Sequence, residues 1–213
     1  MFDLPASTVV NRFLPKEKFY KKTTMSSKLR SAFTDEIEKI TWTHKLSHDT
    51  LNIAADDMLA ELQIFEVLLK SDIISKAVLR HIDSAIPYPI IYLLHKPGSP
   101  ATQVITSLAA LKKEYGMKTK NDDFITTGWS QPDAPFVLHG AKLSHMYVGY
   151  LFQIMGIQQR PYSDPKRAIE EWERSIELRK QIEAINKKIA SEPSVAKKQE
   201  LARERYALEK LLK

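Results

Sequence analysis

The chain contains no cysteine and only 6 glycines among its 213 residues. The lack of cysteine excludes disulfides, thiolate zinc sites and a cysteine nucleophile. Neither G-x-G-x-x-G nor G-x-x-x-x-G-K-S/T occurs, so nothing in the sequence indicates a phosphate-binding loop, and the hydrolase pattern G-x-S-x-G is also missing. These absences favour a protein without a cofactor and lower the expectation that it is an enzyme.

Long apolar runs are also missing. No run approaches the ~20 residues that a membrane-spanning helix needs. The longest candidate, 147–157, is interrupted by Gly149, Gln153 and Gly156. The opening letters MFDLPAST show neither the basic nor the apolar region of a signal peptide. We therefore expect a cytoplasmic location and no membrane partner.

The six histidines are scattered along the chain, and no H-E-x-x-H motif of the metalloprotease type occurs. Isolated histidines are more often surface residues or hydrogen-bonded core residues than metal ligands. The sequence therefore predicts no metal site.

Positive charge is concentrated in one segment. The net charge is +6, and segment 11–30 contains seven basic residues against a single acid, Glu17, so it accounts for the whole excess. Such a patch can contact phosphates, in a way that would be weak, non-specific and salt-dependent, but without a nucleic-acid-binding motif the pattern favours a surface segment that only meets solvent. The candidate contacts are Lys16, Lys18, Lys21 and Lys22.

The segment from Glu61 to His95 predicts the centre of the fold. Runs 62–69 and 90–94 are rich in β-branched, aromatic and leucine residues, which is typical of buried strands. Between them, apolar residues recur every three or four positions, as on one face of a helix. Pro87 and Pro89 end that helix. The predicted order is strand, helix, strand, with 62–69 central and buried on both faces apart from Gln63 or Glu66.

The remaining elements complete an α/β (α+β) core over residues 1–160. We expect a mixed sheet of roughly four or five strands, with helices packed on it. Residues 2–22 predict an extended arm with a helical turn near Pro15, and Ser26 or Ser27 begins a helix through Phe33. Further strands are predicted at 37–46, in a hairpin over 102–111 and at 124–129, with an irregular connection over 47–59. A helix is predicted over 143–157.

Composition changes at 160–165, which predicts a second domain over residues 161–213. This region lacks glycine, is dense in Glu, Lys and Arg, and predicts an antiparallel helical hairpin of coiled-coil type. Ser163 or Asp164 is expected to cap its first helix. Its apolar stripe needs cover from the core, from a second copy or from a partner protein. The candidate contact residues are Ile176, Ile182, Ile185 and Ile189.

Glu66 and Lys70 are the weak candidates for catalysis. Restriction-type nucleases carry an acid-x-Lys pair on a central strand, with further acids on adjacent strands. Asp35, Glu36 and Asp57 are the candidates for such an acid here. Here Leu68 occupies the position of the lysine, and Lys70 lies about 13 Å from Glu66 along a strand. The pattern therefore favours a non-catalytic protein over a degenerate or rearranged nuclease.

Several strings carry a resemblance to a known family. They are the opening MFDLPASTVVNRFLPKEKFY, then ITWTHKLSHDTLNI, ELQIFEVLLK and DSAIPYPIIYLL, and the tail INKKIASEPSVAKKQELARERYALEKLLK. In these the chain resembles the bacterial domain-of-unknown-function family 4391. The resemblance implies no catalytic residues. Because genes of this family often lie beside a DNA methyltransferase and a helicase in defence loci, it implies an accessory subunit of a DNA-modification or phage-defence assembly.

Overall fold

The computed structural model describes residues 3–20, 25–119, 124–130, 140–156 and 165–212. These belong to two compact units, Met1–Gln159 and Arg160–Lys213. Asp164 and Ser163, the predicted caps of the first hairpin helix, lie outside the described residues. No helix in the described ranges is long and apolar enough to cross a membrane.

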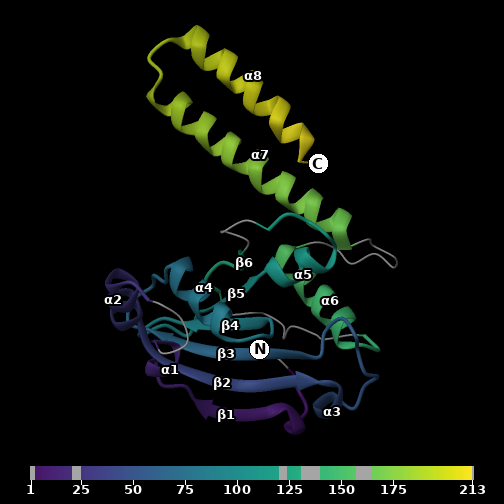
Figure 1. Ribbon diagram of the computed structural model, residues 1–213. Coiled ribbons are helices and arrows are strands. Elements are labelled where there is room, and N and C mark those ends of the chain that lie inside the picture. The colour runs from purple at the N-terminus through teal and green to yellow at the C-terminus, as the bar shows by residue number, and fades with distance from the viewer. Residues whose placement is uncertain (1–2, 21–24, 120–123, 131–139, 157–164, 213) are drawn as a thin grey trace. The chain divides into compact units, whose positions relative to one another are not determined.

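The first unit is built on a six-stranded sheet in the order β1-β2-β3-β4-β5-β6 (Figure 1). The strands are β1 (Val9–Phe13), β2 (Ile37–Ser47), β3 (Glu61–Leu69), β4 (Ile90–His95), β5 (Thr102–Ser107) and β6 (Phe124–Thr126). Only β3 and β4 run parallel, and every other neighbouring pair is antiparallel. The predicted mixed sheet and α+β class are therefore confirmed.

The parallel pair is joined by α4 (Lys76–Ala85), as the strand, helix, strand pattern predicts. Helix α4 buries Val78, Leu79 and Ile82 in one core cluster with Phe65 and Val67 of β3. Parallel neighbours need such a crossover, because a tight turn can join only antiparallel strands. This unit therefore sets the order of the central strands.

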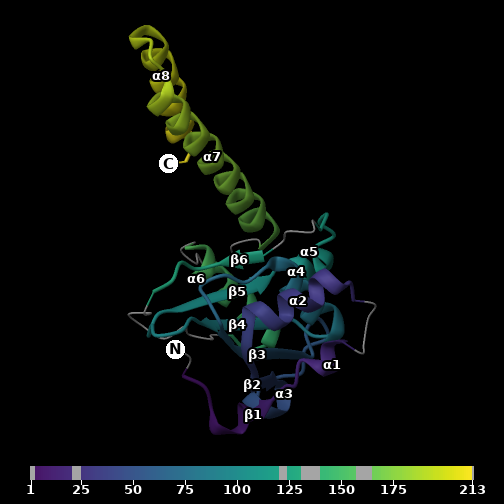
Figure 2. The ribbon, with the colours of Figure 1, turned by 90° about the vertical axis from the view of Figure 1, so that its left-hand side faces the viewer.

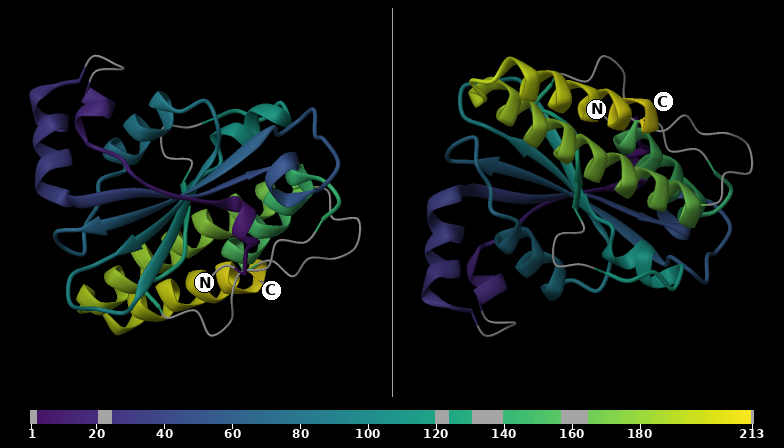
Figure 3. Two further views of the ribbon diagram at one scale, coloured as in Figure 1. Left: turned by 90° about the horizontal axis from the view of Figure 1, so that it is seen from below. Right: turned by 90° about the horizontal axis from the view of Figure 1, so that it is seen from above.

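Helices cover both faces of the sheet (Figures 2 and 3). On the face of α4 lie α1 (Glu17–Tyr20) and α2 (Ser27–Glu36), whose Phe19 and Phe33 enter the same core cluster. On the other face lies α6 (Leu143–Met155), whose Tyr147 hydroxyl donates to the carbonyl oxygen of Ser107 at 3.1 Å. The central strands β3 and β4 therefore lie in a middle layer with helices on both sides.

Two carboxylates accept hydrogen bonds from the first turns of α4 and α6, although they lie far from these helices in the sequence. Glu36 Oε2 accepts the backbone N–H of Ser75 at 2.7 Å, and Asp56 Oδ2 accepts that of Ser144 at 2.6 Å. Burial opposes ionisation of Asp56, but the hydrogen bonds from Ser144, Met58 and Leu59 outweigh it and lower its pKa. Such caps satisfy donors that the helix itself leaves unpaired. Ser26 caps α2 through Leu29 N, as predicted.

Four predictions about the core need correction. Residues 9–13 of the predicted extended arm form a strand of the sheet, since they pair with β2 as an exposed edge whose burial does not alternate. This accounts for a sixth strand beyond the four or five expected. The return strand over 102–111 ends at Ser107, where α5 (Ala109–Glu114) follows. The connection over 47–59 contains α3 (His48–Leu51), which a capping box between Ser47 and Thr50 stabilises.

The fourth correction concerns the burial of β3. Gln63 is buried, with 7% of its surface exposed. Glu66 is exposed, as predicted, but Leu68 is also exposed, with 39% of its surface accessible. Leu68 lies opposite His95, the last residue of β4, so this end of the strand passes the edge of the covered region. Periodicity identifies the strand but does not show where its cover ends.

The second unit is a pair of antiparallel helices, α7 (Pro165–Ser191) and α8 (Val195–Leu211), as predicted. They are joined by Glu192, Pro193 and Ser194, and the Ser194 side chain caps α8 by accepting from Lys197 N. In α7, Leu178 and Ile185 are buried. Arg205 of α8 donates to Asn186 Oδ1 of α7 at 3.2 Å, where a coiled coil would place an apolar contact.

We predict that Val67→Asp prevents soluble, folded expression. Val67 is fully buried between β2 and β4, and an unpaired carboxylate there costs several kcal/mol against a typical total stability of ~5–15 kcal/mol. Leu68→Asp, one residue along on the exposed side, is the matched control and should express normally. Soluble yield and thermal unfolding measure both, and a folded Val67→Asp protein would contradict the role given to β3.

A second prediction concerns Asp83, which accepts a 2.6 Å hydrogen bond from the hydroxyl of buried Tyr92. Burial raises the pKa of Asp83 from 3.8 to about 6, although the bond from Tyr92 works in the opposite direction. The unfolded chain therefore releases this proton first, so stability falls as the pH rises from about 4 to about 6, by at most about 3 kcal/mol.

Asp83→Asn keeps an acceptor for Tyr92 and removes the charge. The variant should be more stable than the parent at about pH 7 and equal to it at about pH 4 in urea unfolding. If Asp83→Asn raised the free energy of unfolding equally at both pH values, the charge of Asp83 would not be the cause of the difference in stability.

Candidate functional site

The structure gives Glu66 and Lys70 different partners. Glu66 Oε1 pairs with His95 Nε2 of the neighbouring strand at 2.9 Å. Lys70 follows the end of β3, and its backbone N–H donates to Glu36 O at 2.9 Å. Glu36, one of the candidate acids, accepts a hydrogen bond from the backbone N–H of Ser75 at the start of α4. In the described ranges, no three His, Asp or Glu side chains are grouped where they could hold a metal ion.

His44 and His48 are four residues apart, a spacing that can hold a metal on one helix. Here His44 lies in β2, and His48 begins α3. The two side chains therefore do not share a helix face, and burial lowers the pKa of His44. His48 pairs instead with its neighbour Asp49 at 3.4 Å.

The structure describes two members of the predicted lysine cluster, Lys16 and Lys18. Lys16 Nζ donates to the carbonyl oxygen of Ile37, and burial is the main cause that lowers its pKa. Lys18 is exposed on α1. Lys21 and Lys22 lie outside the described residues. Lys16 is thus turned toward β2, and Lys18 remains the described candidate for contact with an anion.

Lys18 lines a cavity of about 280 Å³ on the face of the sheet that α1 and α4 cover. Its lining combines four aliphatic side chains, four aromatic residues, one amide and two cations. The lining residues are Arg12, Leu14, Lys18, Phe19, Trp42, Gln63, Phe65, Ala85, Ile86, Pro87 and Tyr88. They come from β1 and the residue after it, from α1, β2 and β3, and from the end of α4 with the segment that follows it, so the fold rather than one loop assembles the cavity.

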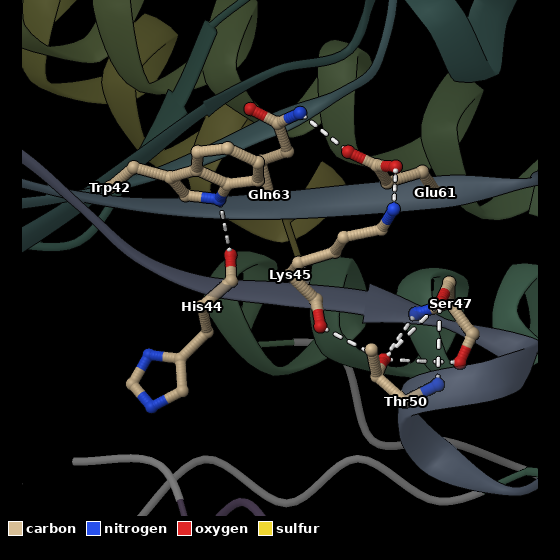
Figure 4. Close-up of polar contacts among 7 residues, drawn as sticks. All are labelled: Trp42, His44, Lys45, Ser47, Thr50, Glu61 and Gln63. Carbon is tan, nitrogen blue, oxygen red and sulfur yellow. Dashed lines mark hydrogen bonds and ion pairs between the residues drawn. The ribbon is translucent and has the colours of Figure 1, made fainter. Parts of the chain in front are cut away.

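A polar relay fixes the amide of Gln63 in this cavity (Figure 4). Lys45 Nζ pairs with Glu61 Oε2 at 3.0 Å, and Gln63 Nε2 donates to Glu61 Oε1 at 2.6 Å. Glu61 and Gln63 are only 8% and 7% exposed. The hydrogen bond and the charge of Glu61 raise the pKa of Lys45. Buried polar groups require such partners, and this pairing orients the amide.

The orientation of the amide has a chemical consequence. Because the Nε2 group of Gln63 faces the carboxylate of Glu61, the carbonyl oxygen points away from Glu61, as Figure 4 shows. Trp42 Nε1 is occupied as well, since it donates to His44 O at 2.9 Å across an irregularity in β2. The cavity therefore receives an acceptor from Gln63 and a ring surface from Trp42.

Two cations line the cavity, Arg12 and Lys18. Neither Arg12 nor Lys18 forms an ion pair within the part of the chain that the structure describes. Both are exposed at the rim, on β1 and α1. Unpaired cations beside a polar and aromatic cavity are available to an anionic group of a ligand.

On the second unit, the four isoleucines of the predicted stripe are unequally exposed. Ile185 is 4% exposed, and Ile176, Ile182 and Ile189 are half-buried. Ile185 is therefore not available to a partner while the hairpin stays folded. The large exposed apolar residues are found on α8 instead, namely Val195, Tyr206 and Leu211.

The residues that sequence reasoning missed are Arg12, Trp42, Glu61 and Gln63. Glu61 and Gln63 share one face of β3 by the period of two, beside the apolar Phe65. Two polar residues on the core side of a buried strand are unusual, and this was the available signal. Arg12 had no such signal, because its position depends on the pairing of β1 with β2.

These features define an α+β protein with a mixed sheet and a basic, aromatic cavity on one face. The family model described as "Domain of unknown function (DUF4391)" matches residues 2–211, so the chain belongs to this family. No match was found among curated proteins or among solved structures.

We predict that Lys45→Met destabilises the protein by about 1 kcal/mol, because it leaves the carboxylate of Glu61 without its cation. The figure is small because Lys45 is 40% exposed. Lys39→Met is the matched control on the exposed side of β2 and should be neutral. Urea unfolding measures both, and equal stabilities would show that Lys45 does not support the relay.

Proposed function

We propose that this protein is a non-catalytic interaction subunit of a DNA-modification or phage-defence assembly, with the helical hairpin as its docking arm. The observation that carries the proposal is the exposure of α8. No side chain of this 17-residue helix is fully buried, and Val195, Tyr206 and Leu211 are 71%, 58% and 58% exposed. A helix gains most of its stability from burial of an apolar face, so these side chains favour a further partner.

The contact between α7 and α8 supports this interpretation. Arg205 of α8 occupies a position toward α7, where it bonds to Asn186 and pairs with Glu209 at 3.2 Å. Polar groups at such positions contribute less to helix pairing than leucine does. The hairpin therefore covers its own apolar residues sparsely, which is typical of helices that bind another surface.

The charge of α8 indicates the chemistry of the partner. The helix carries Lys197, Lys198, Arg203, Arg205 and Lys210 against Glu200, Glu204 and Glu209, a net charge of +2. We expect a protein surface with an apolar groove and an acidic rim. The family resemblance implies a DNA methyltransferase or a helicase of the same locus as that partner.

The alternatives are a degenerate nuclease and a non-specific nucleic-acid-binding protein. For the first, Glu66 would have to leave His95 before it could bind a metal ion. For the second, the described part of the lysine cluster offers Lys18, while Lys16 is bonded to the carbonyl of Ile37. Neither alternative has an observation that favours it over the docking arm.

The proposal predicts separable losses. Removal of residues 164–213 should leave a folded first unit with a similar melting temperature that no longer co-purifies with the methyltransferase or helicase. In the full chain, the triple variant Val195→Ser, Tyr206→Ser and Leu211→Ser should keep its helical circular dichroism and weaken binding by about 100-fold, from the lost apolar burial.

Lys187→Gln on α7, which removes an exposed ion pair with Glu183, is the matched control and should bind normally. Size-exclusion chromatography with light scattering tests the rival occupant, a second copy of the chain. A triple variant that still binds both partners, or a truncated chain that aggregates, would contradict the docking arm.

A further inference from the structure

The cavity beside Gln63 has the dimensions and lining of a small-ligand site. Its volume of about 280 Å³ lies near the lower limit of ~300 Å³ for ligand pockets. Leu14, Phe19, Phe65 and Ile86 supply apolar walls, to which a few oriented polar groups are added. That combination is what distinguishes a binding pocket from a packing defect.

The aromatic residues and the amide point to a flat, polar ring. Trp42 and Tyr88 line the cavity, and the N–H of Trp42 is already used by His44 O, so what Trp42 offers is its ring. Stacking of a base on an aromatic side chain is worth ~1–3 kcal/mol. The relay from Lys45 through Glu61 holds the amide of Gln63 so that its oxygen accepts a hydrogen bond. A ring with an exocyclic amine satisfies this acceptor.

The cations at the rim point to a negative charge attached to that ring. Arg12 and Lys18 line the same cavity and have no ion-pair partner among the described residues. Arginine pairs with phosphate through two parallel hydrogen bonds, and lysine acts as a point charge. An aromatic ring with an amine and a phosphate within one cavity is the description of a nucleotide.

We propose that this cavity binds a nucleotide whose base carries an exocyclic amine. The base lies against Trp42 and Tyr88 with its amine toward Gln63 Oε1, and the phosphate is bound by Arg12 and Lys18. Glu61 is a positioning residue, since it acts on the ligand only through the orientation of Gln63. The site lies in the first unit and does not depend on the hairpin or on its partner.

Calorimetric titration of the full chain tests the proposal with matched pairs of ligands. Cytidine monophosphate should bind about tenfold more tightly than uridine monophosphate, which has an oxygen in place of the amine, and adenosine monophosphate more tightly than inosine monophosphate. Cytidine and ribose 5-phosphate, which each lack one half of the ligand, should both bind more weakly than cytidine monophosphate.

Variants assign each role. Arg12→Ala and Lys18→Ala should each weaken nucleotide binding about tenfold and leave nucleoside binding unchanged. Glu61→Gln should make the affinities for cytidine and uridine monophosphate nearly equal, because an amide at position 61 can form a hydrogen bond to Gln63 in either orientation of its side-chain amide. Tyr88→Ala should weaken the binding of every nucleotide, whatever its base. Lys39→Ala, an exposed cation of β2 outside the cavity, is the matched control and should change nothing.

Arg12, Lys18 and Tyr88 are exposed or at the rim, so these variants remain informative even where Glu61→Gln fails to fold. A single-stranded oligodeoxycytidine that binds more tightly than the mononucleotide would identify the ligand as one unit of a strand, and the reverse would identify a free nucleotide. The proposal is overturned if no nucleotide binds saturably at millimolar concentration. Equal affinity for ribose 5-phosphate, or binding that survives both cation variants, also overturns it.

Discussion

The burial of β3 on both faces is the constraint on which the rest of the first unit depends. This strand lies between an antiparallel and a parallel neighbour, and the parallel one requires the crossover through α4. Phe65 and Val67 then form a core with α4, while Leu62 and Ile64 need cover on the opposite face. A strand of this kind fixes the register of both neighbours, because a slip of one residue would exchange the two faces.

The same constraint explains why a polar cavity exists inside an apolar face. Glu61 and Gln63 occupy core-side positions of β3, where an unpaired carboxylate or amide would be costly. Lys45, directly opposite Gln63 in the antiparallel register, supplies the missing charge. The pairing leaves one oriented acceptor beside the aromatic residues of β2 and of the segment after α4. A specific surface thus follows from satisfying buried groups.

Much of the fold could be predicted from the sequence, because its signals are local. The period of two in β2, the apolar runs of β3 and β4 and the helical spacing in α4 each identify their element. The edge strand β1 was missed because it is exposed on both faces and carries no alternation. The candidate site was not predictable, since Arg12, Trp42 and Gln63 meet only through strand pairing. Glu66, the predicted catalytic candidate, was chosen from spacing alone, and its pairing with His95 depends on the parallel register.

The most direct test of this account is native-state hydrogen exchange, resolved by residue or by peptide. If β3 organises the first unit, the amides of Glu61–Leu69 exchange only through global unfolding and are the slowest in the chain. The edge strand β1 and the sparsely covered α8 then exchange faster through local opening. Exchange of β3 at the rate of β1 or α8 would contradict the account, because the central strand would not be the element that holds the others in place.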